Sequence, residues 1–132
     1  MDFMDAATAL RDLMSAIDEH RWSDLEMYLH PDFTCLFVHS GESFSREQWI
    51  KFNAEYPGFD RLRVEELVGG ANEAACRSHV TSKDGGGIQQ FGCASFARMS
   101  DGLILRLTEI WTGVDQTPPP GTRPELESPA RS

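Results

Sequence analysis

A glutamate lies among apolar residues near the end of the chain and is the first candidate for chemistry. In the segment 103–112, side-chain alternation places Glu109 on one face with apolar residues, namely Leu105, Leu107 and Trp111. A lone buried carboxylate is costly, so such a residue needs a partner or a raised pKa. A carboxyl group tuned toward neutral pH can act as a general acid or base.

Arg77 and His79 are the candidate partners of Glu109. They lie two residues apart in the segment 74–82, so both point to the same side of a strand. His39, on an earlier strand, completes the group. We predict that Arg77 engages a polar or anionic group of a ligand and that His79 or Glu109 moves a proton. The predicted ligand-binding walls are mostly aromatic and comprise Phe33, Phe37, Trp49, Tyr56, Trp111 and the small residue Cys93.

Two other interpretations of these residues remain open. Arg77 and Glu109 could form a partly buried ion pair with a purely structural role. His39, His79 and Glu109 have the composition of a two-histidine, one-carboxylate metal site, but no H-x-x-H or H-E-x-x-H spacing supports it. We therefore predict neither a metal nor a cofactor.

Helices are predicted in the first half of the chain. Apolar residues recur at steps of three and four from Phe3 to Ile17, which is typical of an amphipathic helix. Ser23 to Glu26 has the pattern of a capping box that opens a short helix, ended by His30-Pro31. A second capping box, Ser45 to Gln48, opens a third helix that Pro57-Gly58 ends.

Strands account for the remaining ordered chain. A first strand is predicted over Phe33 to His39, and four more over Leu62–Val68, Ala74–Ser82, Ile88–Met99 and Leu103–Thr112. Short glycine-rich links between the last four indicate an antiparallel meander. We predict an α+β fold in which N-terminal helices pack on a strongly curved, mixed but mostly antiparallel sheet, giving a cone with an internal pocket. Residues 1–114 form one domain, and the proline-rich residues 115–132 form an extended or disordered tail.

Composition limits the class of partner. The chain has 132 residues and a formal net charge of -9, which disfavours nucleic acid. No basic cluster or long apolar stretch indicates a membrane. Three cysteines cannot pair completely and have no C-x-x-C spacing, which is typical of a reducing compartment. We expect a cytoplasmic protein.

Several short phrases, in this order, resemble the nuclear transport factor 2-like superfamily. They are Leu29 to Phe33, Ser45 to Trp49, and Asp101 to Ile104 followed by Thr108 to Trp111. The nearest branches are the SnoaL-like polyketide cyclases and small bacterial proteins of unassigned role, and the resemblance covers Ala6 to Gly113. It implies a cystatin-like cone with a deep pocket and commonly a homodimer. The superfamily includes cyclases, ketosteroid isomerase, scytalone dehydratase, limonene epoxide hydrolase and noncatalytic binding modules.

The resemblance also bears on the candidate residues. Epoxide hydrolases of this superfamily use an Asp-Arg-Asp constellation. Glu109 occupies the position of one acid, and Arg77 with His79 resembles the Arg-x-Asp strand, so that a histidine replaces the other acid.

Two functional hypotheses follow. The first is a SnoaL-like protein that binds a small apolar or amphipathic molecule in an internal, largely apolar pocket. If it is an enzyme, it is an isomerase, cyclase, dehydratase or hydrolase that works by general acid-base chemistry. The alternative is a noncatalytic homodimeric interaction module. Its interface would be the apolar outer face of the sheet, comprising Leu36, Val38, Val80, Ala94, Phe96 and Ile110.

Overall fold

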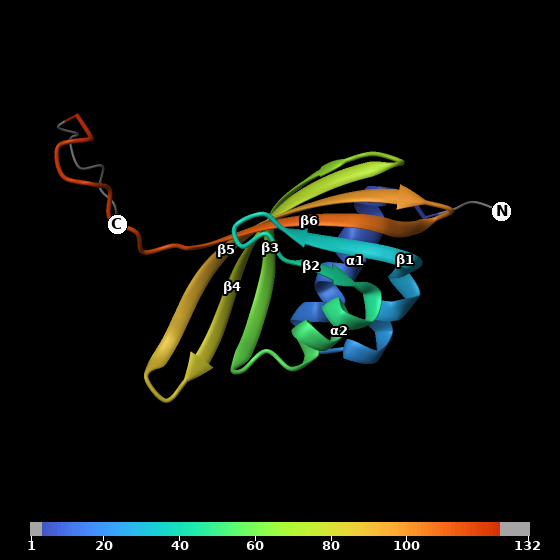
Figure 1. Cartoon of the computed structure of the whole chain (residues 1–132), viewed down its shortest axis with the longest axis horizontal. Helices are drawn as coiled ribbons and strands as arrows, with labels where there is room; N and C mark the ends of the chain where they lie inside the picture. Colours follow the sequence, from blue (N-terminus) through green and yellow to red (C-terminus); the bar gives the residue numbers. More distant parts are fainter. Residues whose placement is uncertain (1–3, 125–132) are drawn as a thin grey trace.

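The computed structural model describes residues 4–124. Along the chain the elements are α1 (Ala6–Asp18), the 3-10 helix η1 (Trp22–Tyr28), β1 (Leu29–Phe37), β2 (Ser43–Ser45), α2 (Arg46–Ala54), β3 (Phe59–Gly69), β4 (Glu73–Asp84), β5 (Gly87–Ser100) and β6 (Leu103–Gly113). The strands form one six-stranded sheet, and the helices lie together on one side of it (Figure 1).

The first helix follows its predicted apolar stripe but begins later. The side chain of Asp5 accepts a hydrogen bond of 2.8 Å from the backbone N–H of Thr8 and so caps α1. The helix therefore starts at Ala6, and Phe3 lies outside the described residues. Its buried face, which includes Leu10, Leu13 and Ile17, packs on the sheet.

The second predicted helix is wrong in type and in its end. Residues 22–28 form a 3-10 helix whose N-cap, Arg21, makes no side-chain cap bond, so the Ser23 capping box does not form. Pro31 does not end a helix, because β1 has already begun at Leu29. The pairing of β1 with β6 is irregular between Leu29 and Thr34, and an irregular stretch of strand is where a proline is tolerated.

The third predicted helix is confirmed together with its cap. Ser45 Oγ accepts from the backbone N–H of Gln48 at 3.2 Å, and Gln48 Oε1 accepts from the backbone N–H of Ser45 at 2.9 Å. The residues just before it, Ser43 to Ser45, form the short strand β2, which was not predicted. This cap fixes the start of α2, and α2 carries several residues of the site described below.

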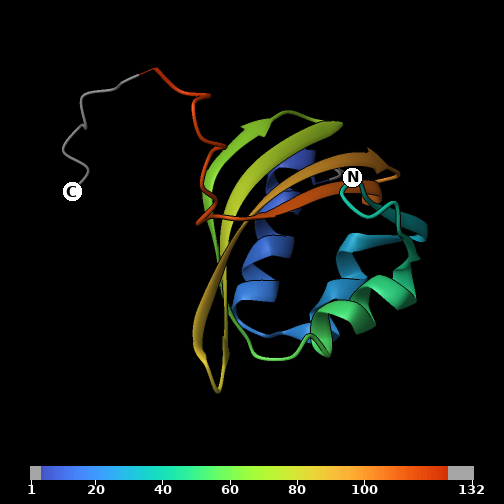
Figure 2. The same cartoon turned by 60° about the vertical axis from the view of Figure 1, so that its left-hand side comes forward.

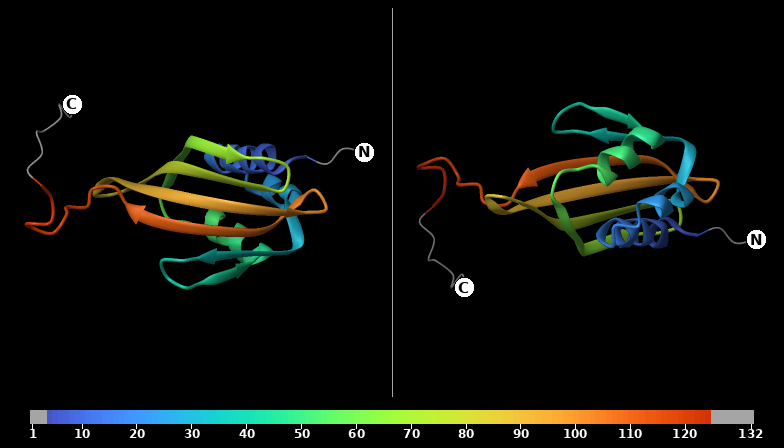
Figure 3. Two further views of the ribbon diagram at one scale, coloured as in Figure 1. Left: turned by 90° about the horizontal axis from the view of Figure 1, so that it is seen from above. Right: turned by 90° about the horizontal axis from the view of Figure 1, so that it is seen from below.

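The sheet is mixed, as predicted. Its strand order is β2-β1-β6-β5-β4-β3; β1 and β6 are parallel, and every other neighbouring pair is antiparallel. The sheet curves strongly and remains open (Figure 2). Figure 3 shows the strands covering one side of the molecule from above and the helices lying on the other side from below. The concave side therefore faces α1 and α2.

Burial confirms the predicted inner faces of β1 and β5 and, from Leu107 onward, that of β6. Cys35, Cys93, Ser95, Leu107 and Glu109 are all buried on the concave side. Leu105, also predicted on the inner face, is only partly buried; the pairing of β5 with β6 is irregular there, and its neighbour Ile104 is fully buried instead. The convex side leaves large apolar side chains exposed, among them Leu36, Val38, Phe96 and Ile110.

The predicted face of β4 is wrong. Residues directly opposite each other on antiparallel strands share a face. Cys76 lies opposite Ser95, and Ser78 lies opposite Cys93, so the inner residues of β4 are the even-numbered ones. Arg77 and His79 consequently lie on the convex face. Val80, which was expected on the convex face, is buried on the concave one.

The C-terminal segment follows β6. Residues 115–124 form no helix or strand, and residues 125–132 of the predicted tail lie outside the described part of the chain. Within residues 4–124 no helix has both the length and the apolar character needed to cross a membrane.

Candidate active site

Glu109 lies on β6 at the centre of the concave face and is 4% exposed. Its Oε2 accepts a hydrogen bond from Ser95 Oγ at 3.0 Å, and its Oε1 accepts a longer one from Trp111 Nε1 at 3.4 Å. The indole N–H of Trp49 lies close enough to this carboxyl to lower its pKa but makes no hydrogen bond to it. Among residues 4–124, the polar groups that act on Glu109 are therefore neutral.

Burial controls the acidity of this carboxyl. Loss of solvation raises the pKa of Glu109 to about 7, and the donors Ser95, Trp111 and Trp49 only partly offset it. A carboxyl with this pKa can both give and take a proton near neutral pH.

Three thiols lie near Glu109, on β1, β4 and β5. Cys35, Cys76 and Cys93 are all free and buried. Burial raises the pKa of each thiol, and the negative charge of Glu109 raises it further. The thiols are thus protonated near neutral pH and are poor nucleophiles.

A cavity of about 240 Å³ lies between the helices and the concave face of β3, β4, β5 and β6. Most of its wall is apolar or aromatic, from Ile17, Phe37, Phe52, Phe59, Leu62, Val80, Phe91 and Trp111. Its polar lining comes from His39, Asn53, Tyr56 and Ser82. No Asp, Glu, Lys or Arg among the described residues lines it.

Trp111 connects this cavity to the buried carboxyl. Its ring lines the cavity while its Nε1 donates to Glu109, which does not itself line the cavity. The backbone N–H of Trp111 donates to Nδ1 of His39 at 3.3 Å, and His39 stacks on Phe37 with ring centroids 5.3 Å apart. A neutral His39 must therefore carry its proton on Nε2.

The cavity brings together part of the predicted ligand-binding set. Phe37, His39, Tyr56 and Trp111 line it. Phe33, Trp49 and Cys93 lie on the same side of the sheet but inside the packed core, where the rings of Phe33 and Trp49 have centroids 5.4 Å apart.

Arg77 and His79 do not share this space, and the prediction that they meet Glu109 is wrong. The side chain of Arg77 is 58% exposed on the convex face, where it pairs with Glu65 and, at 3.5 Å, with Glu66. His79 Nε2 contacts Gln90 Oε1 at 2.9 Å on that same face. A structural ion pair between Arg77 and Glu109 is excluded by the same geometry.

Sequence reasoning missed several cavity residues, two of which the correct face of β4 would have identified. Val80 and Ser82 belong to an alternating set without charge, Ala74-Cys76-Ser78-Val80-Ser82, which is typical of an inward face. Asn53 lies one helical turn after Trp49 on α2 and donates from Nδ2 to the carbonyl oxygen of Trp49 at 2.8 Å. Phe91, on β5, shares its face with Cys93.

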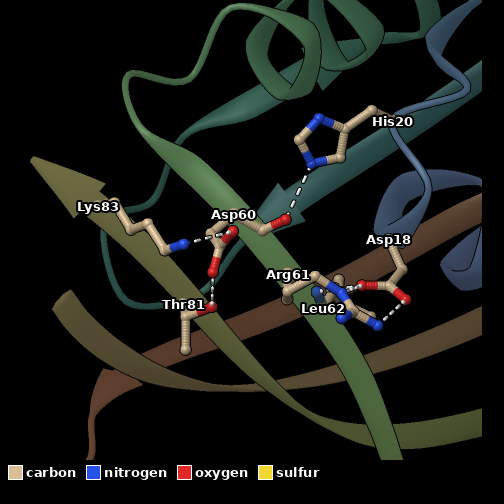
Figure 4. A network of polar contacts seen from close by, with 7 residues as sticks. All are labelled: Asp18, His20, Asp60, Arg61, Leu62, Thr81 and Lys83. Atoms are coloured by element: carbon tan, nitrogen blue, oxygen red, sulfur yellow. Dashed lines mark hydrogen bonds and ion pairs between the residues drawn. The ribbon is translucent and has the colours of Figure 1, made fainter.

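A polar network holds the wall of the cavity at the end of α1 (Figure 4). Asp18 accepts two hydrogen bonds from Arg61, at 2.7 and 3.0 Å, and one from the backbone N–H of Leu62 at 2.8 Å. His20 Nε2 donates to the carbonyl oxygen of Asp60 at 2.9 Å. Because Ile17 and Leu62 both line the cavity, these contacts fix the spacing between α1 and β3 there.

The metal interpretation gains no support from the geometry. Within residues 4–124 no three side chains of the His, Cys, Asp or Glu types are placed to hold a metal ion together. His79 in particular lies on the opposite face of the sheet from Glu109.

Several solved structures share this fold. A candidate ketosteroid isomerase from Kribbella flavida superposes with a TM-score of 0.78 at 24% identity, over 95% of this chain and 90% of its own. An NTF-2-like protein of unknown function from Burkholderia xenovorans gives 0.72 at 18% identity, over 84% and 85%. An LEH-like epoxide hydrolase from M. tuberculosis gives 0.70 at 12% identity, over 83% and 84%. At these identities the likeness shows the fold alone.

Sequence comparison identifies the family. Among curated proteins, none is significantly similar to this chain. The model of the SnoaL-like domain, however, matches residues 10–107, which include most of α1, all of α2 and most of the sheet. The chain therefore belongs to the SnoaL-like family, in the nuclear transport factor 2-like fold.

Proposed function

We propose that this protein binds a small, neutral, largely apolar molecule in the cavity between its helices and the concave face of the sheet. The observation that carries the proposal is the lining: about 240 Å³ of space is surrounded mainly by aromatic and aliphatic side chains, with none of the described charged residues among them. An ionised ligand group would lose its hydration there without gaining a counter-charge. Of the polar or anionic group that Arg77 was predicted to engage, only a neutral polar group suits this lining, and Arg77 does not reach it.

The polar lining defines what the ligand carries. A neutral His39 offers an N–H donor at Nε2, because Nδ1 already accepts from Trp111. Asn53 uses its Nδ2 on the carbonyl of Trp49, which leaves Oδ1 as an acceptor. A carbonyl or hydroxyl group on an otherwise apolar skeleton suits these two partners.

Thermal stabilisation by a matched pair of probes tests the binding proposal. The probes are 2-naphthol and 2-naphthoate at pH 7, which share a ring system and differ in charge. The neutral probe should raise the melting temperature, and the anion should not. Val80→Phe, which fills the cavity, should abolish the shift. Val38→Phe, the same change on the exposed convex face, should preserve it. Equal stabilisation by the anion, or normal binding by Val80→Phe, would refute the proposal.

Proton transfer is the catalytic part of the proposal and depends on Glu109. Its pKa of about 7 suits a general acid or base in an isomerase, cyclase, dehydratase or hydrolase step. The ring of Trp111 separates the carboxyl from the cavity, so this ring must move aside for Glu109 to reach a ligand. His79 takes no part, since it lies on the convex face.

Exchange of carbon-bound hydrogen provides the test of this part. In D₂O, the protein should accelerate deuterium incorporation next to the carbonyl of 2-decalone, followed by NMR. Glu109→Gln should reduce the acceleration by about 100-fold or more. Equal exchange by Glu109→Gln and wild type would remove Glu109 as the acid-base group while leaving the binding proposal intact.

A second candidate function, homodimerisation, is favoured by the convex face. Residues in register across β1, β6, β5, β4 and β3 form one continuous outer row, Leu36-Thr108-Phe96-Ala75-Val68. Phe96 is 48% exposed, and Ile110 and Val38 extend the apolar area beside it. A second copy would remove this area from water at about 25 cal/mol per Å². We also propose a cytoplasmic location, supported by three free cysteines.

Light scattering at micromolar concentration tests the dimer. The wild type should have twice the mass of the chain, and Phe96→Asp should be monomeric while keeping its cavity. A monomeric wild type would contradict this second function.

A further inference from the structure

The indole nitrogen of Trp49 is an unpartnered donor in the core. Trp49 is 1% exposed, and its Nε1 has no hydrogen-bond partner among the described residues. A buried N–H without an acceptor has lost its hydration without compensation and destabilises the fold, so such groups are rare. A large aromatic residue kept in this position needs a physical reason.

Its position beside Glu109 supplies one. The N–H lies close enough to lower the pKa of that carboxyl, as do the hydroxyl of Ser95 and the indole of Trp111, but it makes no hydrogen bond to it. An ionised carboxylate only accepts hydrogen bonds and has about four acceptor positions, whereas a protonated carboxyl accepts less well and must itself donate. Three convergent donors therefore match the ionised form, although burial favours the protonated one.

We propose that Trp49 is a positioning residue for Glu109: its indole N–H closes on the carboxylate when Glu109 ionises and is unpartnered while Glu109 is protonated. This inference deepens the proton-transfer part of the proposed function, because it concerns the same acid. Its test needs no ligand, so this inference and the proposed proton transfer can fail separately.

No other group near Glu109 competes for this role. The titratable side chains that face it are the thiols of Cys35 on β1, Cys76 on β4 and Cys93 on β5, and burial keeps them protonated near neutral pH by raising each pKa. On α2, the side chain that lies near Glu109 is Trp49 itself. Among residues 4–124 no charged side chain shifts the pKa of Glu109.

The contact links proton binding to the cavity. Trp49 lies on α2, and the same helix contributes Phe52 and Asn53 to the cavity wall. Asn53 is tied to the backbone of Trp49 by the 2.8 Å hydrogen bond from its Nδ2. A movement of Trp49 toward the carboxylate would thus shift one wall of the cavity. Ligand binding and ionisation of Glu109 must then influence each other reciprocally.

Indole N–H resonances in an ¹H–¹⁵N NMR titration test the proposal directly. The chain has three tryptophans, so three indole signals are expected, and Trp→Phe variants assign them. The Trp49 and Trp111 signals should shift together as Glu109 titrates, whereas the Trp22 signal, whose ring packs against His20, should not depend on Glu109. In Glu109→Gln, both shifts over this pH range should disappear. Trp49→Phe should raise the Glu109 pKa by about one unit, since one hydrogen bond to the charged form is lost. Trp22→Phe, the matched control, should leave it unchanged.

Two results would overturn the proposal. One is a Trp49 signal that stays constant while Trp111 titrates. The other is an unchanged Glu109 pKa in folded Trp49→Phe. If that variant does not fold, the wild-type titration of the Trp49 signal still decides the question.

Discussion

Two carboxyl groups in this small domain face opposite electrostatic conditions. Asp18, at the end of α1, accepts hydrogen bonds from the guanidinium of Arg61 and from a backbone N–H, and these contacts lower its pKa. Glu109, on the concave face of β6, meets only neutral donors, and burial raises its pKa to about 7. The difference follows from position: Asp18 lies at an edge where the exposed Arg61 can reach it, whereas Glu109 is enclosed by strands and helices.

The two carboxyl groups therefore have opposite effects on how the stability of the fold depends on pH. A carboxyl with a lowered folded pKa stabilises the fold above its unfolded pKa, and this contribution is lost as the pH falls. A carboxyl with a raised folded pKa favours the fold at low pH, and this contribution is lost between its unfolded pKa and about pH 7. Near neutral pH the carboxyl of Asp18 thus stabilises the fold, whereas that of Glu109 destabilises it. A buried group that lowers the stability of the fold is typical of a functional site.

Glu109→Gln should give the largest change. Because the amide carries no charge, the variant should gain about 3 kcal/mol relative to wild type between pH 4 and pH 8. Urea unfolding at several pH values measures this gain. Glu65→Gln, on the exposed convex face, is the matched control and should gain almost nothing. A constant difference between Glu109→Gln and wild type across this range would break the comparison.

Asp18→Asn should have the opposite sign. Losing the charge-assisted bonds from Arg61 and Leu62 should destabilise the fold by about 2 kcal/mol at pH 7. The loss should shrink below about pH 4, where Asp18 of the wild type begins to bind a proton. Asp60→Asn, which weakens only a 3.2 Å contact with Thr81 and a 3.5 Å contact with Lys83, should lose less than half as much. Equal losses of stability in the two variants would show that the contacts of Asp18 stabilise the fold no more than those of Asp60.

Arg77→Ala should give the smallest change. Its pairs with Glu65 and Glu66 are solvent-exposed, and such pairs contribute about 0–1 kcal/mol. The variant should unfold within about 0.5 kcal/mol of wild type and bind 2-naphthol normally. A loss of binding in Arg77→Ala would instead favour the pocket that the sequence first suggested.

The sequence predicted the architecture well because periodicity and turn residues act locally. The apolar stripe of α1, the capping box at Ser45 and the glycine-rich links of the meander each depend on neighbouring residues. Alternation alone also placed Glu109 correctly on the inner face of β6, although the irregular pairing near Ile104 puts Leu105 outside the core.

The face of β4 was mispredicted for a physical reason. A buried carboxylate needs a partner or a raised pKa, and the prediction chose Arg77 and His79 as partners, which placed both on the inner face. Glu109 is instead accommodated by a raised pKa and neutral donors. The donor Trp49 comes from a helix, and the spacing between a helix and a sheet cannot be read from alternation.

A titration of the Glu109 carboxyl by ¹³C NMR tests the central claim most directly, with the signal assigned by its absence in Glu109→Gln. The claim is that this acid is buried without a cation and is poised near neutrality. A midpoint close to 7 in the ligand-free protein is the predicted result. A midpoint near that of an ordinary glutamate, about 4.3, would contradict the account, because it would mean that water or a positive charge reaches the carboxyl.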